Sequence, residues 1–411
     1  MRVLLSTIGS RGDVQPLVAL ALQLRALGQD VHLCVPPDFR EWIEGLGIPV
    51  TPIGPELRRF TAASPPAAST PLTPERRREL AEASVAAQFD TIAAAATGCD
   101  VIVGATALQI AARSVAEVIG VPYVFVAYCP TVLPSPLHAP PPLPPIPGVT
   151  PPPATATNRE LWAREAERFN NLFGPALNSH RASLGLAAVS NVLSHILTDT
   201  PWLAADLTLA PWPDPADESA VQTGAWILPN ENPLPAELET FLEAGEAPVY
   251  FGFGSMRASA NLPHVMVQSA RALGRRAIVS RGWADLALVD DESDCLAVDD
   301  VNHHALFKRV AAVVHHGGAG TTTAAALDGR PQVVVPQMYD QHYWAQRVQQ
   351  LGIGTAHAPG LPTTDSLTSA LEHALQPEVA AHAESIGAAV RSDGARTAAR
   401  RLMATDQRGS F

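Results

Sequence analysis

The chain has 411 residues, of which 47% are hydrophobic and 17% are charged. This composition is typical of a well-buried globular protein and excludes a disordered one, and the length predicts two or three domains. The net charge of −12 argues against nucleic acid or an anionic membrane as the main partner.

The N-terminus and the cysteines show no sign of export. The apolar run after Met1 is too short for a signal peptide, and no stretch approaches the roughly 18 apolar residues of a membrane span. The four cysteines are too far apart in the sequence for a metal-ligand motif, and they show no disulfide pattern; they are Cys34, Cys99, Cys129 and Cys295. We therefore expect a soluble, cytoplasmic monomer without a membrane segment.

The N-terminal half alternates predicted strands and helices. Buried strands are predicted at residues 3–6, 31–35, 101–104 and 123–127, and helices at 17–27 and 107–119. Such alternation is typical of βαβ units and predicts a parallel, doubly wound sheet.

The middle of the chain is rich in proline. Residues 134–153 include 11 prolines, which excludes a helix or a central strand. We expect a polyproline-like surface loop, either an inert insertion or a lid that contacts the substrate, and the frequent use of long loops in enzymes favours the lid. A helix is predicted at 158–184, and residues 201–235 are the candidate interdomain linker.

A second series of strands and helices follows this linker. Strands are predicted at 249–255, 277–280, 295–298, 311–314 and 332–336, and the chain ends in a helical region over 380–404. Two doubly wound halves joined by a linker would form a cleft, lined by the loops at the carboxyl ends of the strands.

The most informative motif comes directly after the strand at 311–314. Residues 315–320 read His-His-Gly-Gly-Ala-Gly, and three threonines then open a helix. A helix N-terminus behind a glycine-rich turn favours a phosphate or diphosphate, because backbone N–H groups and the helix dipole point toward it. On the residues alone, a tight turn with a core histidine remains the alternative. The spacing fits neither a Walker loop nor a dinucleotide fingerprint.

The loop after the first strand also carries polar residues. Ser10, Arg11 and Asp13 lie at the strand's carboxyl end, where ligands bind in a doubly wound sheet. Asp13 alone is explained as a helix N-cap, and capping would lower its pKa, which conflicts with a role as a general base. Because Ser10 and Arg11 add polar groups that a cap does not need, both interpretations stay open.

A third polar loop follows the strand at 332–336. Asp340 and Gln341 open the next helix, and neighbouring carboxylate and amide groups can hydrogen-bond to the vicinal hydroxyls of a sugar. Helix capping by Asp340 is the alternative.

Together these loops resemble the inverting family-1 glycosyltransferases of the GT-B fold. The matching segments are 9–16, 251–255, 315–322 and 336–341, and the likeness covers nearly the whole chain. Segments 178–183, 200–206 and 221–228 are similar to actinobacterial enzymes that glycosylate antibiotics of the vancomycin group. The proline-rich segment departs from that pattern in the acceptor-binding region, which leaves the acceptor open.

The resemblance implies an α/β architecture of two Rossmann-like domains that face each other across a cleft. Residues 1–215 would bind the acceptor and residues 216–390 the nucleotide-sugar donor, and a C-terminal helix over 391–411 would pack back on the first domain. The partners would be a small-molecule acceptor and a UDP- or TDP-sugar, with no metal and no other cofactor.

The resemblance also implies a role for each polar residue. Asp13 would be the general base, and the sugar would be transferred with inversion in a single displacement. His316 would be the histidine that faces the ligand, since adjacent strand residues point to opposite sides. The donor diphosphate would be bound by Ser10, Arg11, Ser255, His316, Gly318, Gly320 and Thr321. Asp340 and Gln341 would bind the donor sugar, and Val301 and Trp283 would lie beside the nucleotide base.

We therefore predict an O-glycosyltransferase that acts on a secondary metabolite, with a glycopeptide antibiotic aglycone or pseudoaglycone as the acceptor. A polyketide, macrolide or sterol-like acceptor is the alternative within the same chemistry. A non-catalytic GT-B auxiliary protein could lose the base and the phosphate histidine, whereas this chain keeps Asp13 and His316. A GT-B epimerase would need no acceptor lobe, and the resemblance in the acceptor half argues against it.

Overall fold

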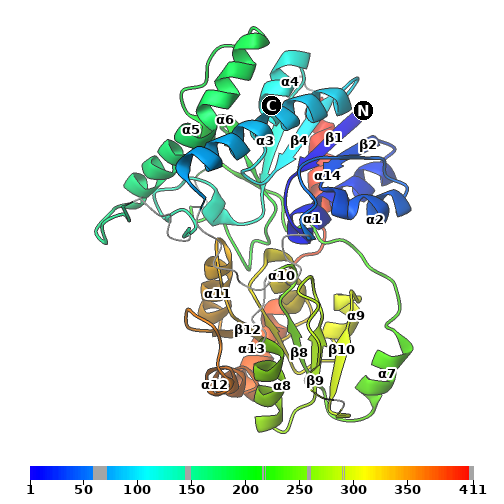
Figure 1. Cartoon of the computed structure of the whole chain (residues 1–411). Coiled ribbons are helices and arrows are strands. Elements are labelled where there is room, and N and C mark those ends of the chain that lie inside the picture. The colour runs from blue at the N-terminus through cyan, green and yellow to red at the C-terminus, as the bar shows by residue number, and fades with distance from the viewer. Residues whose placement is uncertain are drawn as a thin grey trace.

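The structure is a computed structural model, which describes residues 1–58, 72–143, 150–214, 217, 219–256, 261–288, 290 and 292–406. Figure 1 shows two domains, each with a parallel sheet covered by helices. The first sheet has 7 strands and the second has 6. The predicted α/β class is therefore confirmed.

The first sheet has the strand order β3-β2-β1-β4-β5-β6-β7, with parallel pairing throughout. Its strands are β1 (Arg2–Thr7), β2 (Asp30–Val35), β3 (Val50–Pro52), β4 (Val101–Ala105), β5 (Tyr123–Ala127), β6 (Trp202–Leu203) and β7 (Val221–Gln222). The helices of this part are α1 (Arg11–Ala26), α2 (Arg40–Gly45), α3 (Pro74–Ala95), α4 (Ala112–Ile119), α5 (Asn158–Ser183) and α6 (Val192–Leu197), with 3₁₀ turns η1 (Pro37–Phe39) and η3 (Pro130–Val132).

The second sheet has the order β10-β9-β8-β11-β12-β13 and is also parallel. Its strands are β8 (Val249–Gly252), β9 (Ala277–Ser280), β10 (Cys295–Val298), β11 (Ala312–His315), β12 (Gln332–Val334) and β13 (Gly354–Ala356). The later helices are α7 (Ala236–Glu243), α8 (Leu262–Ala272), α9 (His303–Phe307), α10 (Ala319–Leu327), α11 (Gln341–Gln350), α12 (Thr364–Ala374), α13 (Pro377–Gly387) and α14 (Gly394–Asp406).

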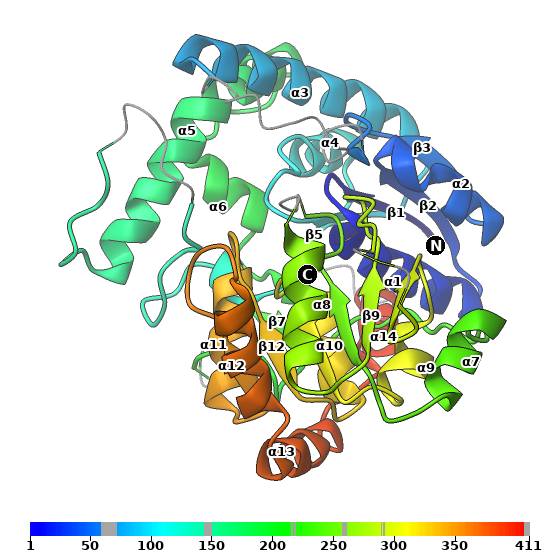
Figure 2. The same cartoon turned by 60° about the horizontal axis from the view of Figure 1, so that its bottom comes forward.

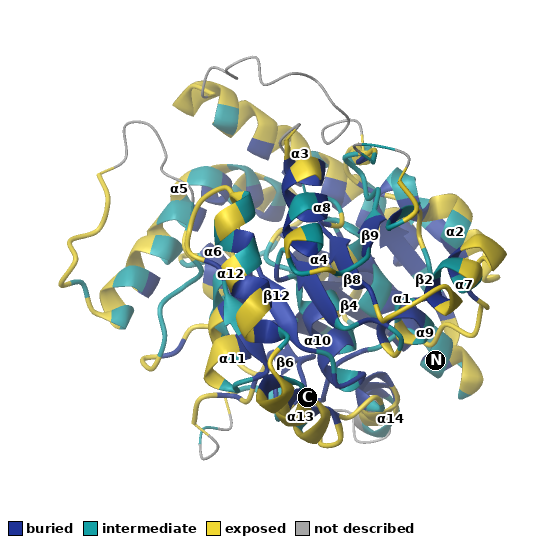
Figure 3. Cartoon of the chain, turned by 90° about the horizontal axis from the view of Figure 1, so that it is seen from below, coloured by how far each residue is buried: buried dark blue, intermediate teal, exposed yellow. Residues whose placement is uncertain are grey.

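The strands form because their residues are apolar on both faces. In β1, the side chains of Val3, Leu4 and Leu5 are completely buried, which is expected of a parallel strand covered by helices on both sides. Figure 3 shows the same pattern for the molecule, with buried strands in the interior and exposed residues on the outer faces of the helices.

The strand order decides where ligands can bind. In both sheets the chain builds three strands in one direction and then returns to place the fourth beside the first. This reversal lies between β1 and β4 in one domain and between β8 and β11 in the other. Doubly wound sheets bind ligands in the crevice at such a point, outside the carboxyl ends of the strands.

The C-terminal helix returns to the first domain. In Figure 1, α14 lies beside α1, and Figure 2 shows the same pair from another side. Ala398 and Leu402 of α14 are buried in the same hydrophobic cluster as Leu17 of α1. At the first residue of α14, a side chain on Gly394 would collide with the backbone of Gly224, so glycine is needed where these segments cross. The domain boundaries themselves stay a prediction.

Three predicted elements differ from the structure. The segment 201–235 is more than a linker, since β6 and β7 extend the first sheet; strands of two residues are too short to show periodicity. The helix predicted at 107–119 begins at Ala112. The predicted helical region 380–404 is divided between α13 and α14.

The described part of the proline-rich segment is held in place. Residues 134–143 and 150–153 form neither a helix nor a regular strand, as predicted. The carbonyl of His138 accepts a hydrogen bond from Trp162 Nε1 at 3.0 Å, and the carbonyl of Pro136 accepts one from Asn158 Nδ2 at 2.9 Å. Both donors belong to α5, so this helix anchors the segment. Residues 144–149 lie outside the described part.

Among the described residues, we find no helix that is both long and apolar enough to cross a membrane.

Candidate active site

The glycine-rich turn places an open helix N-terminus at the end of β11. Gly318 is the N-cap of α10, and no side chain caps the helix there. The hydroxyls of Thr322 and Thr323 bond back to the carbonyls of Gly318 and Ala319. The first backbone N–H groups of α10 thus lack a side-chain cap, and this end of the helix favours an anion.

The first histidine of the motif belongs to the core. His315 is fully buried, its Nε2 is 2.8 Å from Gln332 Oε1, and its Nδ1 accepts a hydrogen bond from the Gly317 N–H at 3.0 Å. Burial lowers the pKa of His315 to about 3, so the ring is neutral at neutral pH. Both ring nitrogens are occupied within the protein, which leaves none for a ligand.

His316 has different surroundings, as strand alternation predicts. Its ring lies against two glycines: a Cβ at Gly318 would be 2.7 Å from Nε2, and one at Gly254 would be 3.1 Å from Cε1. Burial lowers the pKa of His316 to about 4, so this ring is neutral too. Its Nδ1 has no hydrogen-bond partner in the described part of the chain. A neutral imidazole can still donate one hydrogen bond to a phosphate oxygen.

The loops after β8 and β12 meet the glycine-rich turn. Gly254 and Ser255 follow β8, and Gly254 contacts His316. Gly317 has a φ of +93°, and a Cβ there would be 3.0 Å from the carbonyl oxygen of Gln341. Ser255, the residue after Gly254, is partly buried. The structure thus brings together the loops in which Ser255, His316 and Gln341 were predicted to act.

Gln341 is largely committed to its own loop. Its Oε1 accepts hydrogen bonds from the N–H groups of Gln337 at 2.8 Å and Met338 at 3.2 Å. Its Nε2 lies 3.4 Å from the sulfur of Met256. Any contact from Gln341 to a sugar hydroxyl would therefore come from the amide nitrogen, and its sugar-binding role stays a prediction.

Asp340 lies at the same loop, directly before α11. It accepts a hydrogen bond from Trp344 Nε1 at 3.2 Å, and burial raises its pKa to about 6. The residue before it, Tyr339, has a φ of +51° and a side chain that is 49% exposed. A positive φ in a bulky residue is strained, and such strain is frequent in functional loops.

Asp13 is the third residue of α1, and Ser10 is the N-cap. The N–H of Ser10 donates to Asp13 Oδ2 at 2.7 Å, and Ser10 Oγ lies 3.2 Å from the same oxygen. The interpretation of Asp13 itself as the N-cap is therefore wrong, although its carboxylate does satisfy the helix N-terminus. A side chain at Gly9 would collide with this carboxylate, so the turn requires glycine there.

The electrostatics of Asp13 suit a base. Burial raises its pKa to about 6, the Ser10 N–H opposes this rise, and the negative charge of Asp340 adds to it. The two carboxylates come from opposite domains and lie close enough to repel each other. A carboxylate with a raised pKa accepts a proton more readily near neutral pH.

Arg11 links the two domains. Its Nη1 is 2.6 Å from Asp300 Oδ2, and its guanidinium lies 4.5 Å from the ring centroid of Trp42. Asp300 directly precedes Val301, which is partly buried. The charge of Arg11 is thus paired in this structure, and its role as a diphosphate ligand stays a prediction.

A second contact between the domains involves Trp283. Its ring is stacked on Phe39, with ring centroids 5.8 Å apart and planes inclined by 27°. The backbone N–H of Trp283 also donates to the carbonyl of Gly254, in the loop that contacts His316. The placement of Trp283 and Val301 beside the nucleotide base stays a prediction.

Sequence reasoning missed several residues of this region. Tyr128 directly follows β5, and its hydroxyl donates to the carbonyl of Asp13 at 3.0 Å. Its position at the carboxyl end of a strand, where ligands bind in doubly wound sheets, is the sequence feature that could have identified it. Asp300 and Phe39 act across the domains, so no local pattern in the sequence marks them.

One group of possible metal ligands occurs among the described residues. Asp290, Asp294 and Cys295 have ligand atoms within 4.8 Å of one another. Arg271 forms ion pairs of 2.7 Å with each of the two carboxylates. Because the guanidinium already compensates this charge, the group is an ion-pair cluster.

Comparisons with known proteins place the chain in a family. Residues 3–134 match the glycosyltransferase family 28 N-terminal domain, and residues 278–397 match the erythromycin biosynthesis protein CIII-like C-terminal domain. The vancomycin aglycone glucosyltransferase of Amycolatopsis orientalis is 50% identical over 98% of this chain and 97% of its own. The dTDP-epi-vancosaminyltransferase of the same organism is 44% identical over 94% and 93%. The chain belongs to this family of glycosyltransferases.

A solved structure supports the same fold. The glycosyltransferase of kitacinnamycin has a TM-score of 0.74 at 19% identity, with 98% of both chains covered. The predicted GT-B architecture and the predicted family are therefore confirmed. As a member, the chain is a nucleotide-sugar-dependent glycosyltransferase.

Proposed function

We propose that this glycosyltransferase transfers a sugar from a UDP- or TDP-sugar to a hydroxyl of a glycopeptide antibiotic aglycone or pseudoaglycone, with inversion at the anomeric carbon. The observation that carries this proposal is the approach of Asp13, from the first domain, to Asp340 of the second, close enough for the two charges to interact. A relative named as a vancomycin aglycone glucosyltransferase, which matches over almost the full length, supports the acceptor class.

The first domain, residues 1–215, would hold the acceptor hydroxyl near Asp13. The carboxylate removes the proton of the hydroxyl as its oxygen attacks the anomeric carbon, and the bond from that carbon to the diphosphate breaks on the opposite side. A general base of this kind contributes about 10²–10⁴-fold to the rate. Burial, with a smaller contribution from the charge of Asp340, raises the pKa of Asp13, which favours this step.

The second domain, residues 216–390, would hold the donor. The N-terminus of α10, with Gly318, Gly320 and Thr321, would face the diphosphate, and His316 would donate a hydrogen bond to it. These groups would offset the charge that develops on the leaving group, so we propose that transfer needs no metal. Asp340 would accept hydrogen bonds from donor sugar hydroxyls.

The two relatives are named for different donor sugars: one is a glucosyltransferase and the other a dTDP-epi-vancosaminyltransferase. The donor sugar and the nucleotide therefore need a direct test. We would incubate the protein with UDP- and TDP-sugars in pairwise combination with glycopeptide aglycones and pseudoaglycones, and detect products by mass spectrometry. Asp13→Ala serves as the inactive control.

We expect a mass increase of one sugar on a glycopeptide with the wild-type protein and none with Asp13→Ala. Transfer to polyketide, macrolide or sterol acceptors alone would overturn the proposed acceptor class and leave the chemistry intact. Equal product from Asp13→Ala would remove Asp13 as the base.

A further inference from the structure

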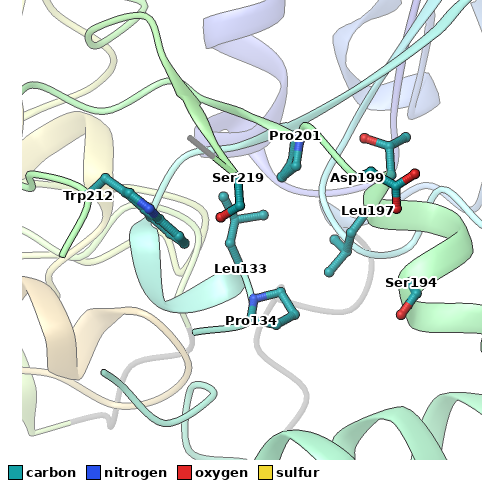
Figure 4. Close-up of a pocket in the computed structure, with 9 residues that line it drawn as sticks. Leu133, Pro134, Ser194, Leu197, Asp199, Pro201, Trp212 and Ser219 are labelled. Atoms are coloured by element: carbon teal, nitrogen blue, oxygen red, sulfur yellow. The ribbon is translucent and has the colours of Figure 1, made fainter. Parts of the chain in front are cut away.

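A pocket of about 250 Å³ lies in the first domain, next to the proline-rich segment. Figure 4 shows Trp212 on one side and α6 with the turn after it on the other, and Leu133 and Pro134 lie between them. The inner walls are apolar and also include Leu197 and Pro201. Ser194, Asp199 and Ser219 are exposed polar residues among those that line the pocket.

The walls of this pocket are fixed by hydrogen bonds and packing. The backbone N–H of Trp212 donates to Gln222 Oε1 at 2.9 Å, and the indole packs edge-on against His138, with ring centroids 5.9 Å apart. His138 Nε2 is in turn 2.8 Å from the carbonyl of Leu133, on the neighbouring wall. The proline-rich segment thus joins two walls through one imidazole.

The opposite wall carries backbone strain. Thr198 follows α6 and has a φ of +63°, in the left-handed region that a β-branched residue rarely adopts. Such conformations persist where the surrounding structure enforces them, and they are concentrated at ligand sites. The strain turns the chain between Leu197 and Asp199, both of which line the pocket.

The size and the chemistry of the lining select among ligands. A cavity of about 150 Å³ lined by apolar side chains holds benzene, so this pocket has room for one substituted aromatic ring. A sugar would find too few polar partners on the apolar walls. A phosphate would be repelled by Asp199, which carries the only charge among the described residues that line the pocket. A phenolic ring fits both features, with its face on the apolar walls and its hydroxyl toward a carboxylate or serine.

The pocket is connected to the reacting centre through the end of β5. Tyr128, the first residue after β5, donates to the carbonyl of Asp13 at 3.0 Å. The chain then passes through η3 and reaches Leu133 and Pro134 in the pocket wall. A ring bound there would be held by the same loop that contacts the proposed base.

We propose that this pocket is an acceptor subsite that binds one phenolic ring of the acceptor and thereby positions its nucleophilic hydroxyl for Asp13. This inference rests on the proposed function, since it assigns the acceptor an aromatic ring apart from the reacting hydroxyl. It also gives the proline-rich segment a role: through His138 it positions Trp212 and Leu133.

The test uses phenol as a probe, because its binding does not depend on transfer. Saturation-transfer NMR with the full chain should show phenol bound to the wild-type protein. Ser194→Trp places an indole at an exposed position of the pocket and should abolish this signal. Ser183→Trp, at an exposed serine of α5 that does not line the pocket, is the matched control and should bind phenol as the wild type does.

Kinetics then connect the pocket to the acceptor. With a phenol-containing glycopeptide, Ser194→Trp should raise the acceptor KM about tenfold and leave acceptor-independent hydrolysis of the nucleotide sugar unchanged. Phenol should inhibit the wild-type enzyme competitively against the acceptor and not against the nucleotide sugar. This measurement holds even if Ser194→Trp fails to fold.

The outcomes separate the two proposals. If the wild type does not bind phenol, if Ser194→Trp still binds it, or if phenol does not compete with the acceptor, the subsite is overturned. If phenol binds in the pocket but no glycopeptide is glycosylated, the proposed acceptor is wrong and the pocket alone remains.

Discussion

Two helix N-termini flank the interdomain site, and they differ in whether a side chain of the protein caps them. At α1, the carboxylate of Asp13 turns back onto its own helix and accepts the Ser10 N–H at 2.7 Å. At α10, the N-cap is Gly318, and no side chain fills the place. Both ends attract negative charge, but one already holds a carboxylate of the chain and the other is left for a ligand.

The difference shows how one kind of scaffold serves two parts of a reaction. A helix N-terminus that holds its own carboxylate fixes the position of that group and can present a base. An open N-terminus behind glycines lets a phosphate approach the backbone. Burial and the charge of Asp340 then raise the pKa of Asp13, against the effect of the helix cap.

The largest expected effect comes from removing the base without removing the cap. Asp13→Asn keeps an amide oxygen that can accept the Ser10 N–H, but it cannot take a proton. We expect the transfer rate to fall by about 10²–10⁴-fold, with nucleotide diphosphate affinity nearly unchanged by calorimetry. A rate close to that of the wild type would mean that Asp13 serves only to accept the N–H of the N-cap residue Ser10.

The second prediction tests the open N-terminus. Gly318→Ala adds a Cβ that would be 2.7 Å from His316 Nε2, so the ring must move. We expect the affinity for a nucleotide diphosphate to weaken roughly tenfold, as measured by calorimetry.

Gly320→Ala is the companion variant, since a Cβ there meets nothing within 4 Å in the protein. Its thermal stability should not fall, because alanine favours the helix more than glycine does. A loss of diphosphate affinity in Gly320→Ala would then show that the ligand itself approaches this backbone. Full affinity in Gly318→Ala would argue against His316 as a ligand.

The contrast between these helix ends also shows what could be predicted from the sequence. The strand at 311–314 and the glycines after it are local patterns, and they correctly indicate a helix N-terminus at the carboxyl end of a strand. Long apolar runs likewise predict most strands. The two-residue strands β6 and β7 carry no periodicity, so the sequence predicts a linker where they lie.

Long-range pairs are beyond such patterns. Arg11 and Asp300 are 289 positions apart, and nothing near either residue indicates that they form an ion pair. The sequence also does not show that the oxygen of Gln341 is already used by the N–H groups of Gln337 and Met338. These facts depend on how the two domains and their loops pack together.

The third prediction concerns pH. Because Asp13 must be deprotonated to act as a base and its pKa is about 6, kcat/KM for the acceptor should fall as the pH decreases through this value. The negative charge of Asp340 contributes to the raised pKa, so Asp340→Asn should move this acidic limb to lower pH. An unmoved limb in Asp340→Asn would show that they do not interact.

The last effect is on stability. It tests whether the hydrogen bonds at the N-terminus of α1 compensate for the buried charge of Asp13. The folded-state pKa of Asp13 lies above the ordinary value of 3.8, so the folded protein binds this proton more tightly than the unfolded chain does. The charged carboxylate therefore destabilises the fold, by an amount that grows as the pH rises from the unfolded to the folded pKa.

Asp13→Asn removes that charge and should increase the free energy of unfolding at pH 7 by about 3 kcal/mol, since each unit of pKa corresponds to about 1.4 kcal/mol. The gain should vanish near pH 3, where the wild-type side chain is protonated as well. Asp365→Asn, in the first turn of α12 and exposed, should instead lose a little stability, because its charge favours the helix dipole without burial. Chemical denaturation at both pH values distinguishes these cases. A loss of stability in Asp13→Asn at pH 7 would mean that the helix cap outweighs burial, and that the pKa of Asp13 is not raised.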